Sequence, residues 1–340
     1  MSKTEFAVRR ILQGIPTLFG LSIIIFVITR IIPGDPVRAA LGPDASTEQV
    51  EQMRREMGLD EPIYVQYINW LTGVFQGDWG MSVQTRNNVL EDIIVRFPAT
   101  FELVTLAMLF AVLLAIPIGV IAGTNRDRWP DNFSRTLAFI GVSMPRFWIA
   151  ILFQVVFFGM LSLLPLSGRL SRGVERPPHV TGMYLVDSLI AGQPAVFIDA
   201  LSHIALPAIA LGLATMAEIA RYIRSDMIEE SQKDYVLAAK AYGLPTNLIQ
   251  YKYMLKNAFS SALTIIGLAF GFLMGSAFLV ELVFDWPGMA RYGVEAILFT
   301  DFNAIVGITI VVGIIYVLVN IVVDILYGYL DPRITYGGEN

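Results

Sequence analysis

The sequence predicts an all-α polytopic membrane protein with about six transmembrane helices. Hydrophobic residues make up 55% of the 340 residues, charged residues only 16%, and the mean hydropathy is +0.61. Because a soluble chain carries more charge, we expect the apolar surface to face lipid. A bilayer core about 30 Å thick takes about 20 apolar residues per helix. Six stretches fit this length, namely 11–32, 101–122, 136–164, 204–220, 262–283 and 304–330.

The first stretch follows Lys3, Arg9 and Arg10, as the apolar core of a secretory signal peptide would. It is too long for such a core, however, and Pro-Gly-Asp-Pro follows Ile32 in place of a small-residue cleavage site. We therefore expect it to remain as a helix.

The Lys and Arg residues of short loops predict the orientation. They gather between the second and third stretches and between the fourth and fifth: Arg126, Arg128, Arg135, Arg221, Arg224, Lys233, Lys240, Lys252 and Lys256. These loops and both termini should be cytoplasmic in a multi-pass cell-membrane protein. Three arginines in the external loop 165–203 run against this rule, which long translocated segments obey weakly: Arg169, Arg172 and Arg176.

Two external segments lie between the expected helices. The segment 33–98 should form a small cap, and Ser46-Thr47-Glu48-Gln49 predicts a helix start within it. Trp70 and Trp79 either pack inside the cap or anchor it at the interface or to a soluble partner. The loop 165–203 is rich in Gly, Pro and Ser, which predicts irregular structure with short helical pieces.

Composition excludes several classes of function. The net charge of −5, with no basic block beyond the segments that flank the helices, argues against a nucleic-acid partner. The absence of cysteine excludes disulfides and thiolate metal sites. The histidines are His179 and His203, which form no metal-ligand cluster. We interpret His203, at the start of the fourth helix, as an interfacial residue with its hydrogen bonds satisfied.

The loop 221–260 is the longest of the expected cytoplasmic loops, and it is amphipathic and charged. Its pattern predicts a helix over 227–243, a break at Gly243-Leu244-Pro245 and a second helix over 246–257. One interpretation is a rigid helix–turn–helix that docks into a partner protein. The alternative is an amphipathic hairpin at the membrane surface.

Several motifs resemble one family. Asp234-Tyr235, Ala238-Ala239 and Gly243 resemble the coupling motif of type I ATP-binding-cassette importer permeases. Further motifs resemble the B-type permease of dipeptide and oligopeptide importers, in order along the chain: 29–36, Gly141-Val142-Ser143-Met144-Pro145, 164–168, Phe284-Asp285-Trp286-Pro287-Gly288-Met289 and Leu330-Asp331-Pro332-Arg333. The general motif has Glu where this chain has Leu237, and its later Leu-Pro is replaced by 255–258; both departures are similar to the peptide branch.

The resemblance implies a type I importer permease fold and a set of partners. These are a homologous C-type permease, two ATPase subunits, an extracytoplasmic substrate-binding protein and membrane lipid. The coupling residues it implies are Asp234, Tyr235, Ala238, Ala239, Gly243 and Leu244. The chain has no Gly-x-x-x-x-Gly-Lys-Ser/Thr phosphate loop, so ATP and Mg²⁺ should bind the ATPase subunits, and the chain itself should be no enzyme and hold no cofactor.

With this resemblance, the sequence predicts four parts of the chain: 1–32 (tail and first helix), 33–98 (cap), 99–333 (permease domain with coupling helices at 227–257) and 334–340 (tail). Candidate polar residues of the pathway are Glu102, Gln154, Asn320 and Asp324, since polar groups inside a membrane normally face protein or water. For Asn320 and Asp324 we favour structural pairing with neighbouring helices or an Arg. We also expect Glu218 to pair with Arg221.

The substrate is where alternatives remain. The resemblance implies dipeptides or oligopeptides, while other members of the class import oligosaccharides, glutathione or nickel complexes. A different class, the ion-driven secondary transporters, would need more helices or an inverted repeat. An intramembrane enzyme would need a His-Glu-x-x-His pair, paired aspartates or a Ser/His combination.

Overall fold

The computed structural model describes residues 3–31, 36–42 and 44–330, and within these ranges every regular element is a helix. The long helices are α1 (Lys3–Ile31), α5 (Val89–Thr124), α6 (Trp129–Ser143), α9 (Pro194–Glu230), α12 (Leu255–Ser276) and α15 (Phe302–Leu330). The shorter ones are α2 (Pro36–Leu41), α3 (Thr47–Glu56), α4 (Ile63–Phe75), α7 (Arg146–Phe153), α8 (Tyr184–Ile190), α10 (Asp234–Ala241), α11 (Thr246–Leu248), α13 (Phe278–Val283) and α14 (Met289–Leu298). Two π-helices, η1 (Gln154–Met160) and η2 (Ile249–Met254), complete the set, and the predicted all-α fold is confirmed.

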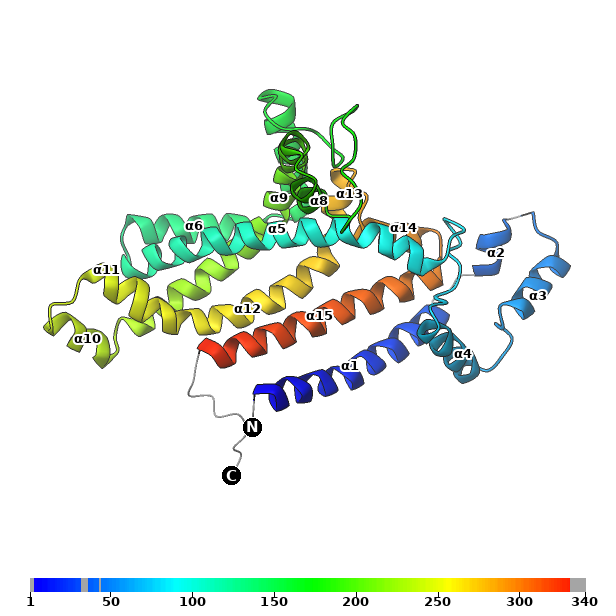
Figure 1. Ribbon diagram of the computed structural model, residues 1–340, viewed down its shortest axis with the longest axis horizontal. Helices are drawn as coiled ribbons and strands as arrows, with labels where there is room; N and C mark the ends of the chain where they lie inside the picture. The colour runs from blue at the N-terminus through cyan, green and yellow to red at the C-terminus, as the bar shows by residue number, and fades with distance from the viewer. Residues whose placement is uncertain (1–2, 32–35, 43, 331–340) are drawn as a thin grey trace.

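The helices form one elongated bundle. Figure 1 places α10 and α11 at one end of the long axis and α2, α3 and α4 at the other, and α1 lies along one edge against α15. The predicted cytoplasmic loops therefore share one end of the molecule and the predicted cap lies at the opposite end. Which end faces the cytoplasm stays a prediction from the Lys and Arg residues.

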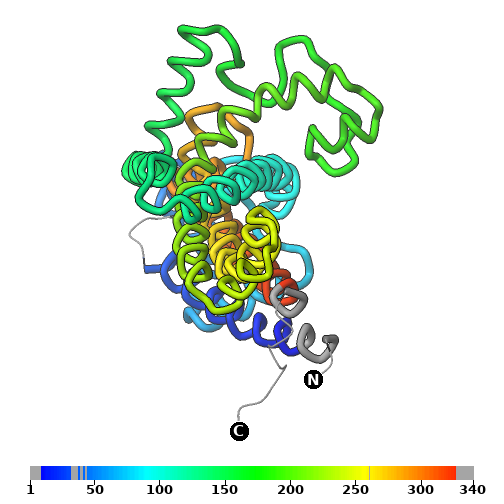
Figure 2. The backbone as a smooth tube through the Cα atoms, turned by 90° about the vertical axis from the view of Figure 1, so that its left-hand side faces the viewer, coloured from blue at the N-terminus to red at the C-terminus, as the bar shows by residue number. Residues whose placement is uncertain are grey.

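The number of membrane spans agrees with the prediction, but two spans are bent. Four helices are long and apolar enough to cross a membrane alone, and two bent pairs bring the total to six among the described residues. The helix predicted over 136–164 is wrong, because α6 and the α7–η1 helix meet at 102°. Met144 at the junction has extended dihedrals, which Pro145 imposes on the residue before it. As a result the green segment with α7 and α8 stands out to one side (Figure 2).

The centre of the bundle is the contact between α5 and α9. Small buried residues recur every fourth position along α5, at Ala107, Ala111, Ala115, Gly119 and Gly123. A Cβ on Gly123 would lie 2.7 Å from Cβ of Met227. Small residues at this spacing let two helix backbones approach closely within a membrane.

Both helices are longer than their predicted spans. They contain 36 and 37 residues, which corresponds to about 54 Å of helix and exceeds the bilayer core. Asn88 caps α5 by accepting a hydrogen bond from the amide of Leu90, so the helix begins 12 residues before Phe101. Charged residues in its first turns conceal this start from an apolar pattern.

Helix α4 of the cap packs on the first span. The predicted helix start at Ser46 is confirmed, and Ser46 and Gln49 form a capping box. On α4, Trp70 lies 5.5 Å from the ring of Phe26 on α1, and Tyr67 contacts the same ring. Trp79 is partly buried against the core. Packing within the chain therefore accounts for both tryptophans.

The hairpin from α13 to α14 is pinned to α5. The indole nitrogen of Trp286 donates to the carbonyl of Ala99 at 3.0 Å, and the amide of Met289 donates to Oγ1 of Thr100 at 2.7 Å. Trp286 is buried. The fifth predicted span, 262–283, is thus divided between α12 and α13, with the break at Ala277. The tail 334–340, residues 331–333 and residues 32–35 of the first motif lie outside the described residues.

Candidate coupling site and polar residues of the pathway

The helix–turn–helix at the narrow end of the molecule has three parts. α9 ends at Glu230, a turn follows, α10 runs from Asp234 to Ala241, and the chain then enters α11. The single helix predicted over 227–243 is therefore wrong. The helical run is interrupted between Glu230 and Asp234, because Lys233 has extended dihedrals and is the N-cap residue of α10. The predicted break after α10 and the start of the next helix at Thr246 are confirmed.

Glu230 holds this turn together. Its buried carboxylate accepts hydrogen bonds from Nζ of Lys233, from the hydroxyl of Tyr235 and, at 3.1 Å, from the side-chain amide of Asn257. Burial, and then the bond to Glu230, raise the pKa of Tyr235 to about 12, so its hydroxyl stays a proton donor at neutral pH. The hydrogen bond to Glu230 likewise raises the pKa of Lys233. Side chains of the turn, of α10 and of α12 thus meet at the carboxylate that ends α9.

Gly243 ends α10 in a Schellman motif. The amide of Gly243 donates to the carbonyl of Lys240 at 3.0 Å, and the amide of Leu244 donates to that of Ala239 at 3.1 Å. Gly243 has a φ of +73°, a left-handed conformation that side chains disfavour. The motif reverses the chain within two residues, as the sequence predicts.

α10 has one buried face and one apolar face in solvent. Val236 is buried, and Tyr235 and Ala239 pack against the core. On the other side Leu237 is 71% exposed and Tyr242 is 87% exposed, and Asp234 and Ala238 are exposed as well. Two large apolar side chains on a helix that is fixed from behind are typical of a protein-binding surface.

The last part of α9 is tied to the start of α6. Asp131 on α6 is fully buried and forms an ion pair with Arg224 on α9, with Nη2 of Arg224 2.8 Å from the carboxylate. Arg135 contacts the same carboxylate at 3.1 Å. These ion pairs fix the last turns of α9 against the start of α6.

Two of the four candidate pathway residues contact the loop 165–203. Glu102 is buried, accepts hydrogen bonds from Arg169 at 2.6 Å and from the amide of Leu185 at 2.7 Å, and so anchors this loop on α5. Gln154 donates to the carbonyls of Leu166 and Val283 at 3.0 and 2.9 Å.

The other candidates lie on α15 near the edge of the bundle. Asp324 pairs with Arg10 of α1 at 3.1 Å, which is the kind of structural pairing we expect from the sequence. Asn320 is half-buried one turn earlier. His203 is buried, with Nδ1 2.8 Å from the carbonyl of Asp199, in agreement with its interpretation as a satisfied residue.

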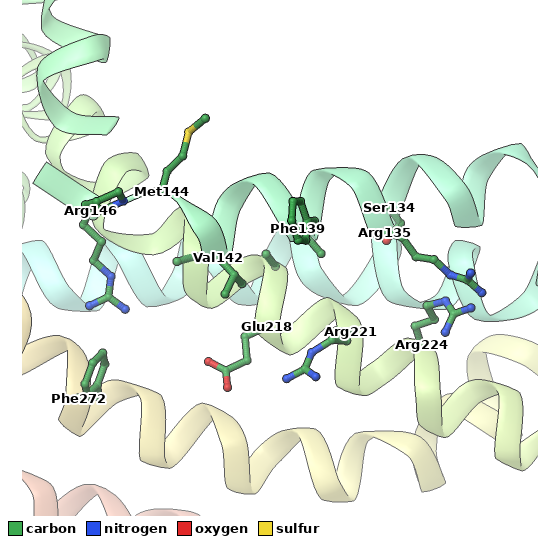
Figure 3. Close-up of a pocket in the computed structure, with 14 residues that line it drawn as sticks. Ser134, Arg135, Phe139, Val142, Met144, Arg146, Glu218, Arg221, Arg224 and Phe272 are labelled. Atoms are coloured by element: carbon green, nitrogen blue, oxygen red, sulfur yellow. The ribbon is translucent and has the colours of Figure 1, made fainter. Parts of the chain in front are cut away.

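A cavity of about 810 Å³ lies elsewhere, between α6, α7, α9 and α12 (Figure 3). Arg146, Glu218 and Arg221 line it. The predicted Glu218–Arg221 ion pair does not form in the part of the chain that is described, because both side chains extend into the cavity. The sequence contains a signal for Arg146, a cation directly after the Met-Pro break of the third span. No group of three or more His, Asp and Glu residues that could hold a metal occurs within the described ranges.

Comparison with known proteins gives matches along nearly the whole chain. The family model for the inner membrane component of binding-protein-dependent transport systems matches residues 115–336, and the model for the N-terminal part of such components matches residues 3–104. The probable D,D-dipeptide transport system permease protein DdpB of Escherichia coli is 44% identical over 94% of both chains. The dipeptide transport system permease protein DppB of Alkalihalophilus pseudofirmus is 40% identical over 97% of this chain and 99% of its own. The glutathione transport system permease protein GsiC of Escherichia coli is 34% identical over 98% and 99%.

Proposed function

The chain belongs to the family of inner membrane components of binding-protein-dependent transport systems, and on this premise we propose that it forms one half of an import pathway for dipeptides and short peptides. It is a multi-pass plasma-membrane permease subunit of an ATP-driven importer. The names of its relatives support peptides over the oligosaccharide and nickel-complex alternatives.

The exposed face of α10 carries the proposal. We infer that Leu237, Ala238 and Tyr242 seat in a groove of an ATPase subunit, while Asp234, Tyr235, Ala239, Gly243 and Leu244 set the position and end of the helix. Glu230 would pass a displacement of α10 directly to α9. A partner can shift the permease between two states only if it binds them with different affinity. Closure of the ATPases would supply that difference.

Further partners complete the pathway in this proposal. ATP and Mg²⁺ bind on two ATPase subunits, and this chain supplies no catalytic group or cofactor. A C-type permease packs beside it, and the apolar surface of α6 and α7, with Phe139 74% exposed and Val142 62% exposed, offers a contact face. An extracytoplasmic binding protein delivers the peptide to the end that carries the cap. We also propose the division of the chain that the sequence predicts, with boundaries at residues 33, 99 and 334.

The experiment is to express the chain with the proteins encoded beside it, purify the assembly in detergent and identify its subunits by mass spectrometry. The proposal predicts a second permease and two ATPase subunits, and predicts that proteoliposomes with the binding protein import a labelled dipeptide when ATP is supplied. An assembly that lacks ATPases, or that imports with an ion gradient alone, would contradict the proposal and support an ion-driven transporter.

A further inference from the structure

Three charged side chains lie together between helices that are long and apolar enough to cross the membrane, and they have no role in the proposed coupling. Arg146 begins α7, and Glu218 and Arg221 lie one turn apart on α9. Figure 3 shows all three side chains pointing toward the space in front of α12. A charged group within a membrane is costly and normally pairs with protein or faces a water-filled route.

Two other arginines of the membrane-spanning helices have carboxylate partners. Arg224 pairs with Asp131, and Arg10 pairs with Asp324. In contrast, no carboxylate of the described residues lies within 4.0 Å of the guanidinium of Arg146 or Arg221. Arg146 donates to the hydroxyl of Ser276 and lies 5.0 Å from the ring centre of Phe272, and Arg221 lies 5.0 Å from that of Tyr222. These contacts orient the two cations without an ion pair.

Glu218 is the acidic counterpart in the same space. It is half-buried, and it is the carboxylate that acts electrostatically on Arg146. Four arginines and one glutamate line the cavity, and two of these arginines, Arg135 and Arg224, are paired with Asp131. Arg146, Arg221 and Glu218 therefore remain to meet a ligand, and they offer charges of both signs to a zwitterion. Its volume, about 810 Å³, lies within the range of small-molecule sites, about 300–1,000 Å³.

The remaining walls are apolar and adaptable. Phe139, Val142, Met144 and Phe272 line the cavity around the charged groups. Unbranched and aromatic side chains can repack around residues of different shape. Such walls suit a ligand whose ends are constant and whose side chains vary.

We propose that this cavity is a transit site for short peptides with free termini, in which Arg146 and Arg221 bind the α-carboxylate and Glu218 binds the α-ammonium group. This inference rests on the proposed function, and it specifies that the permease binds both charged termini of the peptide. Guanidinium groups bind carboxylates through paired, charge-assisted hydrogen bonds, so a C-terminal amide loses both the charge and the geometry. The peptide backbone between the termini would lie along the apolar wall.

The experiment uses the purified complex of both permeases and ATPases, without the binding protein, so that only the membrane subunits select. A tritiated dipeptide with a benzophenone side chain is photoactivated, and the labelled residues are mapped by mass spectrometry. We expect label on the cavity walls, at Phe139 or Phe272, and about tenfold weaker competition by dialanine amide than by dialanine. Arg146→Gln and Arg221→Gln should lower the labelling about tenfold, and Glu218→Gln should remove the preference for dialanine over N-acetyldialanine.

Arg128→Gln is the matched control, because Arg128 is exposed and lies outside the cavity, and it should label like the wild type. The proposal would be overturned if no label is found on the cavity walls, or if dialanine amide competes as strongly as dialanine. Wild-type import of dialanine by the full complex with the binding protein is measured in parallel. If import occurs and the label is misplaced, the transit site alone is wrong. If import fails, the proposed function is wrong.

Discussion

The hydroxyl of Tyr235 on α10 donates a hydrogen bond to the carboxylate of Glu230, the last residue of α9. The two residues lie on either side of the turn that separates a membrane-spanning helix from the helix that we assign to ATPase docking. A force on α10 therefore reaches α9 through a buried side-chain contact as well as through the backbone.

Replacement of Tyr235 by Phe should uncouple ATP hydrolysis from transport. The change removes one hydrogen bond to a charged group, which contributes about 1.5–3 kcal/mol, and keeps the ring that packs against the core. We expect several-fold less peptide imported per ATP hydrolysed, with ATPase subunits still bound. The control is Tyr64→Phe, because Tyr64 is 66% exposed and lies on α4 at the opposite end of the molecule (Figure 1). Equal coupling ratios in the two variants would contradict the role of Glu230.

Gly243→Ala should weaken the end of α10. The φ of +73° costs a residue with a Cβ about 1–2 kcal/mol, while open space surrounds the position, so the effect is conformational and not steric. We expect weaker retention of ATPase subunits during purification in high salt. Gly243→Asn should restore most of it, since Asn accepts this conformation more readily. Identical behaviour of the Ala and Asn variants would show that the turn needs no left-handed residue.

Gly123→Ala tests the close packing of α5 on α9. The added Cβ would lie 2.7 Å from Cβ of Met227 and 2.9 Å from the carbonyl oxygen of Arg224, and overpacking of this kind costs about 1–3 kcal/mol. The unfolding temperature of the complex in detergent should fall. Gly20→Ala is the matched control, because nothing lies within 4 Å of that Cβ, and it should leave the temperature unchanged or raise it slightly. A larger drop at Gly20 would refute the account.

The stability of the loop 165–203 should depend on pH through the carboxylate of Asp187. This buried carboxylate accepts hydrogen bonds from the amides of Thr181 and Gly182 at 2.8 and 2.9 Å. Burial alone would raise the pKa of Asp187, but the hydrogen bonds from Thr181, Gly182 and Val180 outweigh burial and hold the pKa below its ordinary value. The stabilisation is therefore complete above the unfolded-state pKa, about 3.9, and is lost as the pH falls through the lower folded-state pKa.

The difference in unfolding temperature between the wild type and Asp187→Asn measures this contribution. We expect the difference to be largest at pH 6–7 and to shrink toward pH 3, since effects of other groups cancel between the two proteins. A difference that is constant over this range would mean that the carboxylate's charge contributes nothing.

The sequence predicts the number of spans and the coupling loop but not the course of each helix. Apolar runs locate α15 and the end of α1 closely. The starts of α5 and α9 are missed because polar residues, such as Glu91 and Asp92 on α5 and Asp199 and His203 on α9, interrupt the apolar pattern near these starts. Pro145 is visible in the sequence, yet the 102° bend depends on how α7 packs against α9. Local pattern carries no information on such tertiary contacts.

In the candidate site, too, the sequence predicts the local features and misses those that depend on tertiary contacts. Gly243-Leu244-Pro245 marks a turn by local chemistry, which the sequence contains. The role of Glu230 depends on Asn257, 27 residues later, and the pairing of Glu102 with Arg169 joins α5 to an external loop. The spacing of Glu218 and Arg221 predicts a pair, but both side chains turn to a cavity that other helices create.

The most direct test of the central claim is whether ATPase subunits remain bound when the exposed face of α10 is made acidic. Leu237→Asp and Tyr242→Asp change side chains that are 71% and 87% exposed, so the permease itself should fold and insert normally. Phe75→Asp, at an 83% exposed position at the opposite end of the molecule, is the control. We predict that both α10 variants copurify with the second permease but lose the ATPase subunits, and that the control keeps both. Full retention of the ATPases in the α10 variants would contradict the claim and make this helix–turn–helix a hairpin of the membrane surface.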